Sequence, residues 1–211
     1  MSQWRGLLDN LCTENVREPD VRLTGQHCPV HRPRVRPAGH GIEAIFRLRP
    51  SRQINQIVQY VVAVVAQRTG ILLHSAIVLS NHWDVCLTDP EGRICEFTRD
   101  CHAFIARAVN AAHGDFESMW SNEHTSHVRC VEAQDLVDKI AYTMANPVED
   151  FLVAHGKNWP GVRRAWPAGP QTVNRPKKFF RHEKDGGAWP NGCSPGIIAS
   201  TIAFLSWGRA S

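Results

Sequence analysis

Long apolar segments are missing from this chain of 211 residues. The longest apolar run, residues 57–66, contains a glutamine and has about half the length of a membrane span, so we expect no transmembrane helix and no membrane partner. The N-terminal segment lacks the apolar core of an export signal, which predicts a cytoplasmic protein. With 43% hydrophobic and 21% charged residues, the composition is that of an ordinary globular protein with one substantial core.

Paired cysteine motifs are also missing. The seven cysteines are an odd number, are widely spaced and include no CxxC pair, so we expect reduced thiols. Cys12, Cys28, His31 and His40 could together form a zinc site, but their spacing is irregular. An arginine-rich loop is the simpler interpretation of that segment.

Acidic residues are scarce between Lys157 and Lys184, where Glu183 is the single acid among many basic residues. A second basic cluster, residues 32–36, is interrupted by proline and valine. The net charge of +4 is modest, so this local clustering is the more informative feature. Such clusters can neutralise phosphates without reading sequence. A solvated basic surface explains either cluster alone equally well.

The distribution of apolar and turn residues predicts an α+β fold. Residues 1–41 are rich in proline, arginine and histidine and read as an irregular arm. Pro147 disfavours helical geometry at Asn146, so the last predicted helix should end close to that residue. The predicted elements are strand 42–48, helix 51–70, strands 71–79 and 82–88, a short strand 93–97, a helix from Thr98 to 114, strand 127–131 and helix 132–145.

Apart from the short strand 93–97, this order is β-α-β-β-α-β followed by a helix, which is the ferredoxin-like arrangement with an antiparallel sheet. Residues 42–166 would form this domain. Residues 167–211 are rich in proline, glycine and lysine and have no evident place in the sheet. We expect them to form a basic, poorly ordered C-terminal tail.

Tyrosine is scarce too, with only Tyr60 and Tyr142 in the chain. Tyr60 lies in an apolar helix and is most simply a core residue. In the predicted strand 82–88, His82 and Asp84 project to one face while Trp83 points to the other. An imidazole and a carboxylate side by side can hold a divalent metal, and a nearby tyrosine could attack a phosphodiester that the metal polarises. The pattern suggests DNA-strand cleavage, with Tyr142 as nucleophile.

Each residue also has a simpler interpretation. His82 alone would be a core or turn histidine, and Asp84 alone a turn or strand-edge acid. Their shared face on an apolar strand favours a site, because a buried unpaired carboxylate is costly. Trp120 could stack on unpaired bases, although a large apolar residue near the end of an element more often packs.

Two segments together resemble single-tyrosine HUH transposases. Residues 74–87, which contain Asn81 and then His82-Trp83-Asp84, resemble the metal-site strand pair, in which His-hydrophobic-His follows an asparagine. Residues 141–148, AYTMANPV, resemble the tyrosine helix. The pattern is most like that of the REP-associated tyrosine transposases, where a tyrosine stands four residues before Asn-Pro-Val. The resemblance covers roughly residues 42–166.

The resemblance implies a ferredoxin-like nuclease that binds hairpin-forming single-stranded DNA, cuts it with Mg²⁺ or Mn²⁺ and forms a 5′-phosphotyrosine. Tyr142 falls on the nucleophile, His82 and Asp84 on the metal-binding pair, and Asn146 where relatives place a polar third ligand. Helical spacing of four puts Tyr142 and Asn146 on one face. A homodimer and a nucleoid-associated location are further implications. The candidate DNA contacts are Arg163, Arg164, Lys177, Lys178, Arg181 and Trp120.

One position departs from the family, because Asp84 stands where the family has a second histidine. An oxygen ligand suits Mg²⁺ or Mn²⁺ at least as well as imidazole, so metal binding and cleavage can persist. The alternative is a catalytically degenerate, domesticated protein that binds single-stranded or hairpin DNA without cutting it. A ferredoxin-like regulatory domain unrelated to DNA would require both basic clusters and both motifs to be coincidental.

Overall fold

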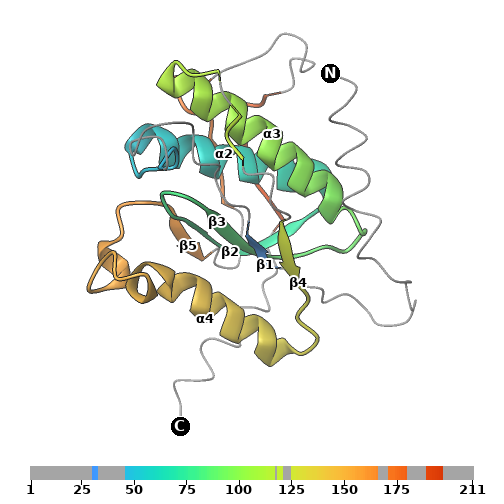
Figure 1. The fold of residues 1–211 in the computed structure, drawn as a ribbon. Helices are drawn as coiled ribbons and strands as arrows, with labels where there is room; N and C mark the ends of the chain where they lie inside the picture. The colour runs from blue at the N-terminus through green and yellow to red at the C-terminus, as the bar shows by residue number, and fades with distance from the viewer. Residues whose placement is uncertain are drawn as a thin grey trace.

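The computed structural model describes residues 30–32, 46–116, 118–120, 125–165, 171–179 and 189–196. Three helices and a five-stranded sheet make up its main body (Figure 1). The elements in chain order are β1 Val30–Arg32, α2 Arg52–Thr69, β2 Leu72–Val78, β3 Trp83–Thr88, α3 Ile94–His113, β4 Ser126–Val128, α4 Ala133–Glu149, a 3₁₀ turn Gly156–Asn158, β5 Arg163–Ala165, β6 Val173–Asn174 and β7 Gly192–Cys193.

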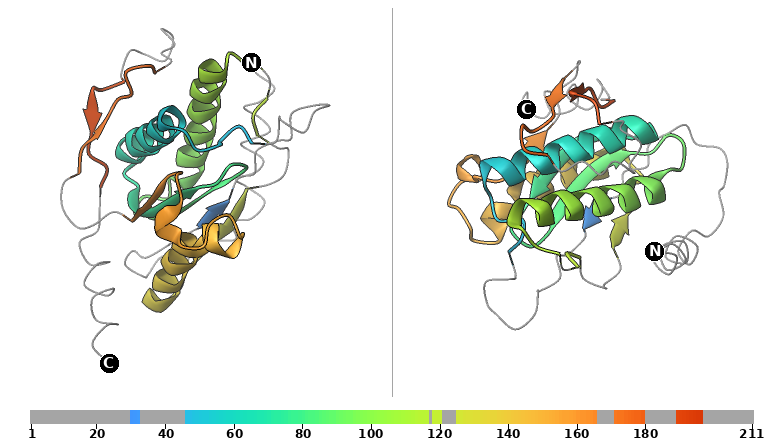
Figure 2. Two further views of the ribbon diagram at one scale, coloured as in Figure 1. Left: turned by 90° about the vertical axis from the view of Figure 1, so that its left-hand side faces the viewer. Right: turned by 90° about the horizontal axis from the view of Figure 1, so that it is seen from above.

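The sheet has the strand order β4-β1-β3-β2-β5, and every neighbouring pair is antiparallel. Helices α2 and α3 lie side by side over one face, and α4 lies on the opposite face (Figures 1 and 2). The molecule is therefore an α+β protein with helices on both faces of an antiparallel sheet.

Alternation along β3 separates these two layers. Trp83, Val85 and Leu87 belong to the main core beneath α2 and α3. Cys86 instead packs with residues on the α4 side, and the neighbouring even position, Asp84, also contacts α4. The predicted strand 82–88 is confirmed, and its period of two assigns each residue to a layer.

Helix α2 confirms the predicted helix 51–70. The Ser51 side chain accepts a hydrogen bond from the Ile54 amide at the N-terminus, and Gly70 ends the helix with φ of 69°. Tyr60 is fully buried in this helix, as predicted.

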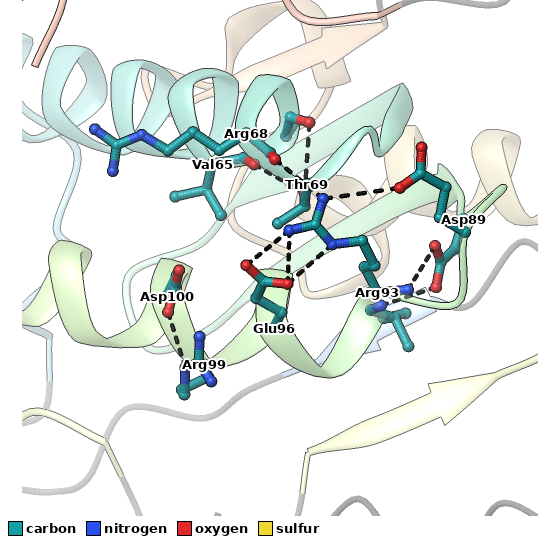
Figure 3. Close-up of polar contacts among 11 residues, drawn as sticks. Val65, Arg68, Thr69, Asp89, Arg93, Glu96, Arg99 and Asp100 are labelled. Carbon is teal, nitrogen blue, oxygen red and sulfur yellow. Dashed lines mark hydrogen bonds and ion pairs between the residues drawn. The ribbon is translucent and has the colours of Figure 1, made fainter. Parts of the chain in front are cut away.

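The start of α3 corrects the sequence analysis, which placed a strand at 93–97 and a helix cap at Thr98. Both oxygens of Asp89 accept hydrogen bonds from backbone amides, one from Arg93 and one from Ile94 (Figure 3). The Arg93 guanidinium pairs with Glu96 one turn later. Because a carboxylate satisfies the first helical N–H groups, the helix begins at Ile94.

The end of α4 corrects a second prediction. The helix continues through Pro147 to Glu149 instead of ending at Asn146. Proline removes one backbone donor, and here the loss falls in the last turn. The Asn146 and Pro147 carbonyls still accept hydrogen bonds from the Asp150 and Leu152 amides. The helix therefore tolerates the proline.

The first strand of the sheet lies outside the predicted strand 42–48. Residues 46–48 form a turn, and residues 42–45 lie outside the described residues. The strand that pairs with β3 and β4 is β1, within the segment that we expected to be an irregular arm. A run of three residues is too short to show a periodic pattern in the sequence.

Part of the predicted tail also packs on the domain. Strands β6 and β7 pair with each other, and Val173, Trp189 and Cys193 form a small apolar cluster with Tyr60 of α2. The Tyr60 hydroxyl donates to the Pro190 carbonyl. Strands β6 and β7 are too short to produce an alternating pattern of apolar and polar residues in the sequence. They are identified from their pairing and from their packing on α2.

Among the described cysteines, Cys95 departs from the expectation of reduced thiols. Cys95 is disulfide-bonded, so the prediction of reduced thiols throughout is wrong there, whereas Cys101 and Cys193 are reduced and buried. The structure does not describe the side chains of the four residues considered as zinc ligands, which are Cys12, Cys28, His31 and His40. Among the described residues, no helix combines the length and apolar character that crossing a bilayer requires.

His74 makes the stability of the fold depend on pH. Its ring contacts the Thr88 hydroxyl at 2.8 Å, and burial lowers its pKa from 6.5 to about 4. Between these values the unfolded chain binds more protons than the folded chain, so stability falls as pH falls, by up to about 1.4 kcal/mol per pH unit. His74→Gln should flatten this part of the profile in urea unfolding. His155→Gln, at an exposed position, is the control, and identical profiles for wild type and His74→Gln would contradict the assignment.

Candidate active site

The turn between β2 and β3 positions His82. The Leu79 amide donates to the His82 carbonyl at 2.8 Å, which closes the turn just before β3. The His82 Nδ1 atom lies 2.8 Å from the Asn81 side-chain oxygen. Because an amide oxygen only accepts, Nδ1 donates this hydrogen bond, and in the neutral ring the lone pair is then on Nε2. This is the arrangement in which an imidazole can act as a metal ligand.

Asp84 and Asn146 meet across the interface between the sheet and α4. The Asn146 amide nitrogen donates to the Asp84 carboxylate at 2.8 Å, and the two side chains are 0% and 2% exposed. This contact joins residues 62 positions apart. It brings together two of the predicted site residues and fixes the orientation of the carboxylate. The Asn146 amide oxygen is then the atom through which this residue could coordinate a cation.

Tyr142 lies one helical turn before Asn146 on α4. The residue is 45% exposed, whereas Thr143 and Asn146 are buried. Tyr142 therefore stands at the margin of the buried helix face, where its phenol is accessible. Residues four apart on a helix have Cβ atoms about 5–6 Å apart, so Tyr142 and Asn146 are neighbours.

Two side chains near the site were not among the predicted residues. Asn81 fixes the tautomer of His82, and the Lys139 ammonium lies 5.6 Å from the centre of the Tyr142 ring. The sequence signal for Lys139 is its spacing of three from Tyr142 on one helix, and Asn81 directly precedes His82. These sequence positions are informative only after His82 and Tyr142 have been identified as site residues.

The side chains of His82, Asp84 and Asn146 carry atoms of the types that a divalent cation binds. In the described part of the chain, no three His, Cys, Asp or Glu side chains gather into a metal site. His82 and Asp84 would provide one nitrogen and one carboxylate, with an amide oxygen from Asn146. Mg²⁺ in particular keeps several waters and takes few protein ligands, so this donor set suits Mg²⁺ or Mn²⁺ better than a structural zinc.

The predicted DNA contacts do not share one surface. Arg163 is exposed on the α4 side, and Arg164 hydrogen-bonds Gln59 of α2 on the other side. Lys177 and Lys178 are exposed after β6, which packs on α2. Arg181 lies outside the described residues.

Trp120 makes contacts typical of a packed residue. Its indole N–H donates to the His102 carbonyl at 2.8 Å, and its ring stacks on the His102 ring with centroids 4.7 Å apart. Burial, with a smaller effect of His127, lowers the pKa of His102 to about 3. Trp120 thus lies against a neutral ring. A role in stacking on DNA bases stays a prediction.

The hydrogen bond between Asn146 and Asp84 should carry a measurable cost. Asn146→Ala removes a donor from a buried carboxylate, and we expect a loss of about 1–3 kcal/mol of unfolding free energy. Gln134→Ala is the matched control, because Gln134 donates to Asp138 on the same helix but at an exposed position. Its cost should stay within about 0.5 kcal/mol. Equal costs in urea unfolding would show that the buried contact adds nothing.

Comparisons with known proteins give one structural likeness. Neither a protein-family model nor a curated protein sequence matches the chain. The solved structure of a REP-associated tyrosine transposase bound to a REP hairpin is similar, with a TM-score of 0.50 and 16% sequence identity. The match covers 79% of this chain and 99% of that one. At this identity, the likeness concerns the fold alone.

Proposed function

We infer that this protein acts on single-stranded or hairpin DNA as a transposase-type strand transferase. The observation that supports this inference is the hydrogen bond between Asn146 and Asp84, because it joins the helix of Tyr142 to the strand that contains Asp84. In this proposal, the exposed Tyr142, the buried Asp84 carboxylate and the His82 imidazole would border one region on the α4 side of the sheet.

The fold supports this inference. The structural neighbour is a REP-associated tyrosine transposase bound to a REP hairpin, and the match covers 99% of its chain. Without β5, the strand order is β4-β1-β3-β2. This is the strand order of the ferredoxin-like arrangement. We propose this arrangement for β1 together with the domain at residues 42–166.

The proposed reaction is an in-line attack by the Tyr142 phenolic oxygen on a DNA phosphorus. The phenol loses its proton to solvent, the new O–P bond gives a 5′-phosphotyrosine, and the departing 3′-oxygen takes up a proton as a hydroxyl. In the reverse direction, a 3′-hydroxyl of another strand attacks the phosphotyrosine and releases the phenol. The covalent bond conserves the energy of the phosphodiester, so rejoining needs no other energy source.

The metal proposed for this site is Mg²⁺ or Mn²⁺. His82 through Nε2, Asp84 through its carboxylate and Asn146 through its amide oxygen would hold it. A bound cation would polarise the phosphate and offset the developing negative charge. In this chain, Asn81 holds the tautomer of His82 and the Asn146 amide nitrogen orients Asp84.

The second candidate function is DNA binding without cleavage. The observation that favours it is the position of Asp84, which is a carboxylate where the family has histidine and is fully buried. Both candidates share the DNA partner. Homodimerisation and a cytoplasmic, nucleoid-associated location are part of the proposal and follow from the resemblance.

One assay separates the two candidates. Wild-type protein is incubated with labelled hairpin DNA that carries a single-stranded flank, with Mn²⁺ or with chelator, and the products are resolved on a denaturing gel. A metal-dependent protein–DNA adduct supports strand transfer. DNA binding without an adduct under either condition supports the non-catalytic candidate, and absence of DNA binding contradicts both.

A further inference from the structure

Strand β5 places Arg163 in line with Asp84. Ile77 of β2 is the register partner of Asp84 on one side and of Arg163 on the other. Directly paired residues of neighbouring strands project to the same face of a sheet. Because neighbouring strands are about 4.8 Å apart, the Cα atoms of Arg163 and Asp84 are separated by roughly 10 Å. Both side chains therefore lie on the α4 side.

The Arg163 side chain is fixed on the helix that carries Tyr142. Its Nε atom donates to the Met144 carbonyl at 2.9 Å, two residues after Tyr142. Its guanidinium also passes close to Gly156, where an added Cβ would lie 3.0 Å from Nε and 3.2 Å from Cζ. The absence of a side chain at Gly156 thus makes room for the guanidinium. The residue remains exposed, so its terminal amino groups can reach a ligand.

Arg164 has different surroundings from Arg163, although the two arginines are adjacent in the sequence. Its register partner is Ala76, which belongs to the core beneath α2 and α3. Its guanidinium hydrogen-bonds the Gln59 and Gln171 side chains. These amide oxygens occupy donors that a phosphate would need. The alternation along β5 thus sends adjacent cations to opposite faces of the sheet.

We propose that Arg163 binds a backbone phosphate of the single strand at the candidate active site, and that Arg164 has no such role. This inference rests on the proposed function and adds to it an anionic subsite beside Tyr142. A guanidinium can bind a phosphate through two parallel N–H donors, and it keeps its charge at all physiological pH values. The bond to Met144 holds this group in place before DNA arrives, which reduces the entropy lost on binding.

The test compares Arg163→Ala with Arg164→Ala, which remove the same charge from adjacent residues. Binding of labelled oligo-dT is measured by fluorescence anisotropy over a series of salt concentrations. For Arg163→Ala, we expect about ten-fold weaker binding and a salt slope reduced by about 0.7, the value for one phosphate of a single strand. Arg163→Lys should keep the wild-type slope, because it retains the charge. Thermal unfolding of each variant shows that the fold is intact.

The outcomes separate this inference from the proposed function. If the wild type binds oligo-dT and Arg163→Ala binds with the same affinity and slope, the phosphate subsite is wrong while DNA binding stands. Equal losses for Arg163→Ala and Arg164→Ala would also overturn it, because general surface charge would then explain both. A wild-type protein that binds neither oligo-dT nor hairpin DNA would overturn the subsite and the proposed function together, whereas binding to hairpin DNA alone would overturn only the subsite. Because the readout is binding, the result does not depend on catalysis.

Discussion

Tyr142→Phe is expected to abolish the covalent protein–DNA adduct while leaving DNA binding intact. The substitution removes only the phenolic oxygen, the atom that would attack phosphorus. Loss of a nucleophile lowers the rate by at least roughly a thousand-fold, so no adduct should appear on a denaturing gel. Tyr142 is an exposed residue and its ring keeps its contact with Lys139, so the unfolding temperature should change little.

The other tyrosine of the chain is the control for this experiment. Tyr60→Phe also removes one hydroxyl, but this hydroxyl is buried and donates to the Pro190 carbonyl. We expect this variant to lose about 1 kcal/mol of stability and to form the adduct as wild type does. An adduct formed by Tyr142→Phe would show that another nucleophile acts, and the proposed mechanism would then be wrong.

Asp84→Asn should weaken Mn²⁺-dependent adduct formation without unfolding the protein. The new amide has nearly the same size and still offers an oxygen to the Asn146 amide nitrogen, so the buried contact can persist. It removes the negative charge, and charge among the ligands sets affinity for a hard divalent cation. We expect the Mn²⁺ concentration at half-maximal activity to rise by at least about ten-fold, a size typical for changes around a metal site.

Asp89→Asn provides the matched control at the other end of β3. Asp89 is also buried, but its carboxylate accepts hydrogen bonds from the first amides of α3. This variant should lose about 1 kcal/mol of stability and keep the wild-type Mn²⁺ dependence. If Asp84→Asn also kept the wild-type dependence, Asp84 would not be a metal ligand, and the non-catalytic candidate would gain support.

Local sequence patterns predicted much of the framework correctly. The apolar spacing in α2, with Ser51 before it and Gly70 after it, predicted that helix, and alternation predicted the strand containing Trp83 and Asp84. These features depend on residues close together in the chain. The prediction of a strand at 93–97 was wrong because the Asp89 carboxylate caps a helix there, a contact that apolar spacing does not reveal.

The sequence by itself determined which side chains are available for the site and which share a face of one element. His82 and Asp84 stand two apart on a strand, and Tyr142 and Asn146 stand four apart on a helix, so period two and period 3.6 align each pair. The chain has only two tyrosines, and Tyr60 lies in an apolar helix, so the sequence also favoured Tyr142 as the nucleophile.

The tertiary structure decided how these pairs meet. Packing of α4 on the sheet makes the contact between Asn146 and Asp84 across 62 residues, and the register of β5 separates Arg163 from Arg164. Neither follows from local periodicity, which fixes the type of an element and the direction of its side chains. Which residue of another element a side chain contacts depends on how whole layers pack, and this packing joins residues far apart in the chain.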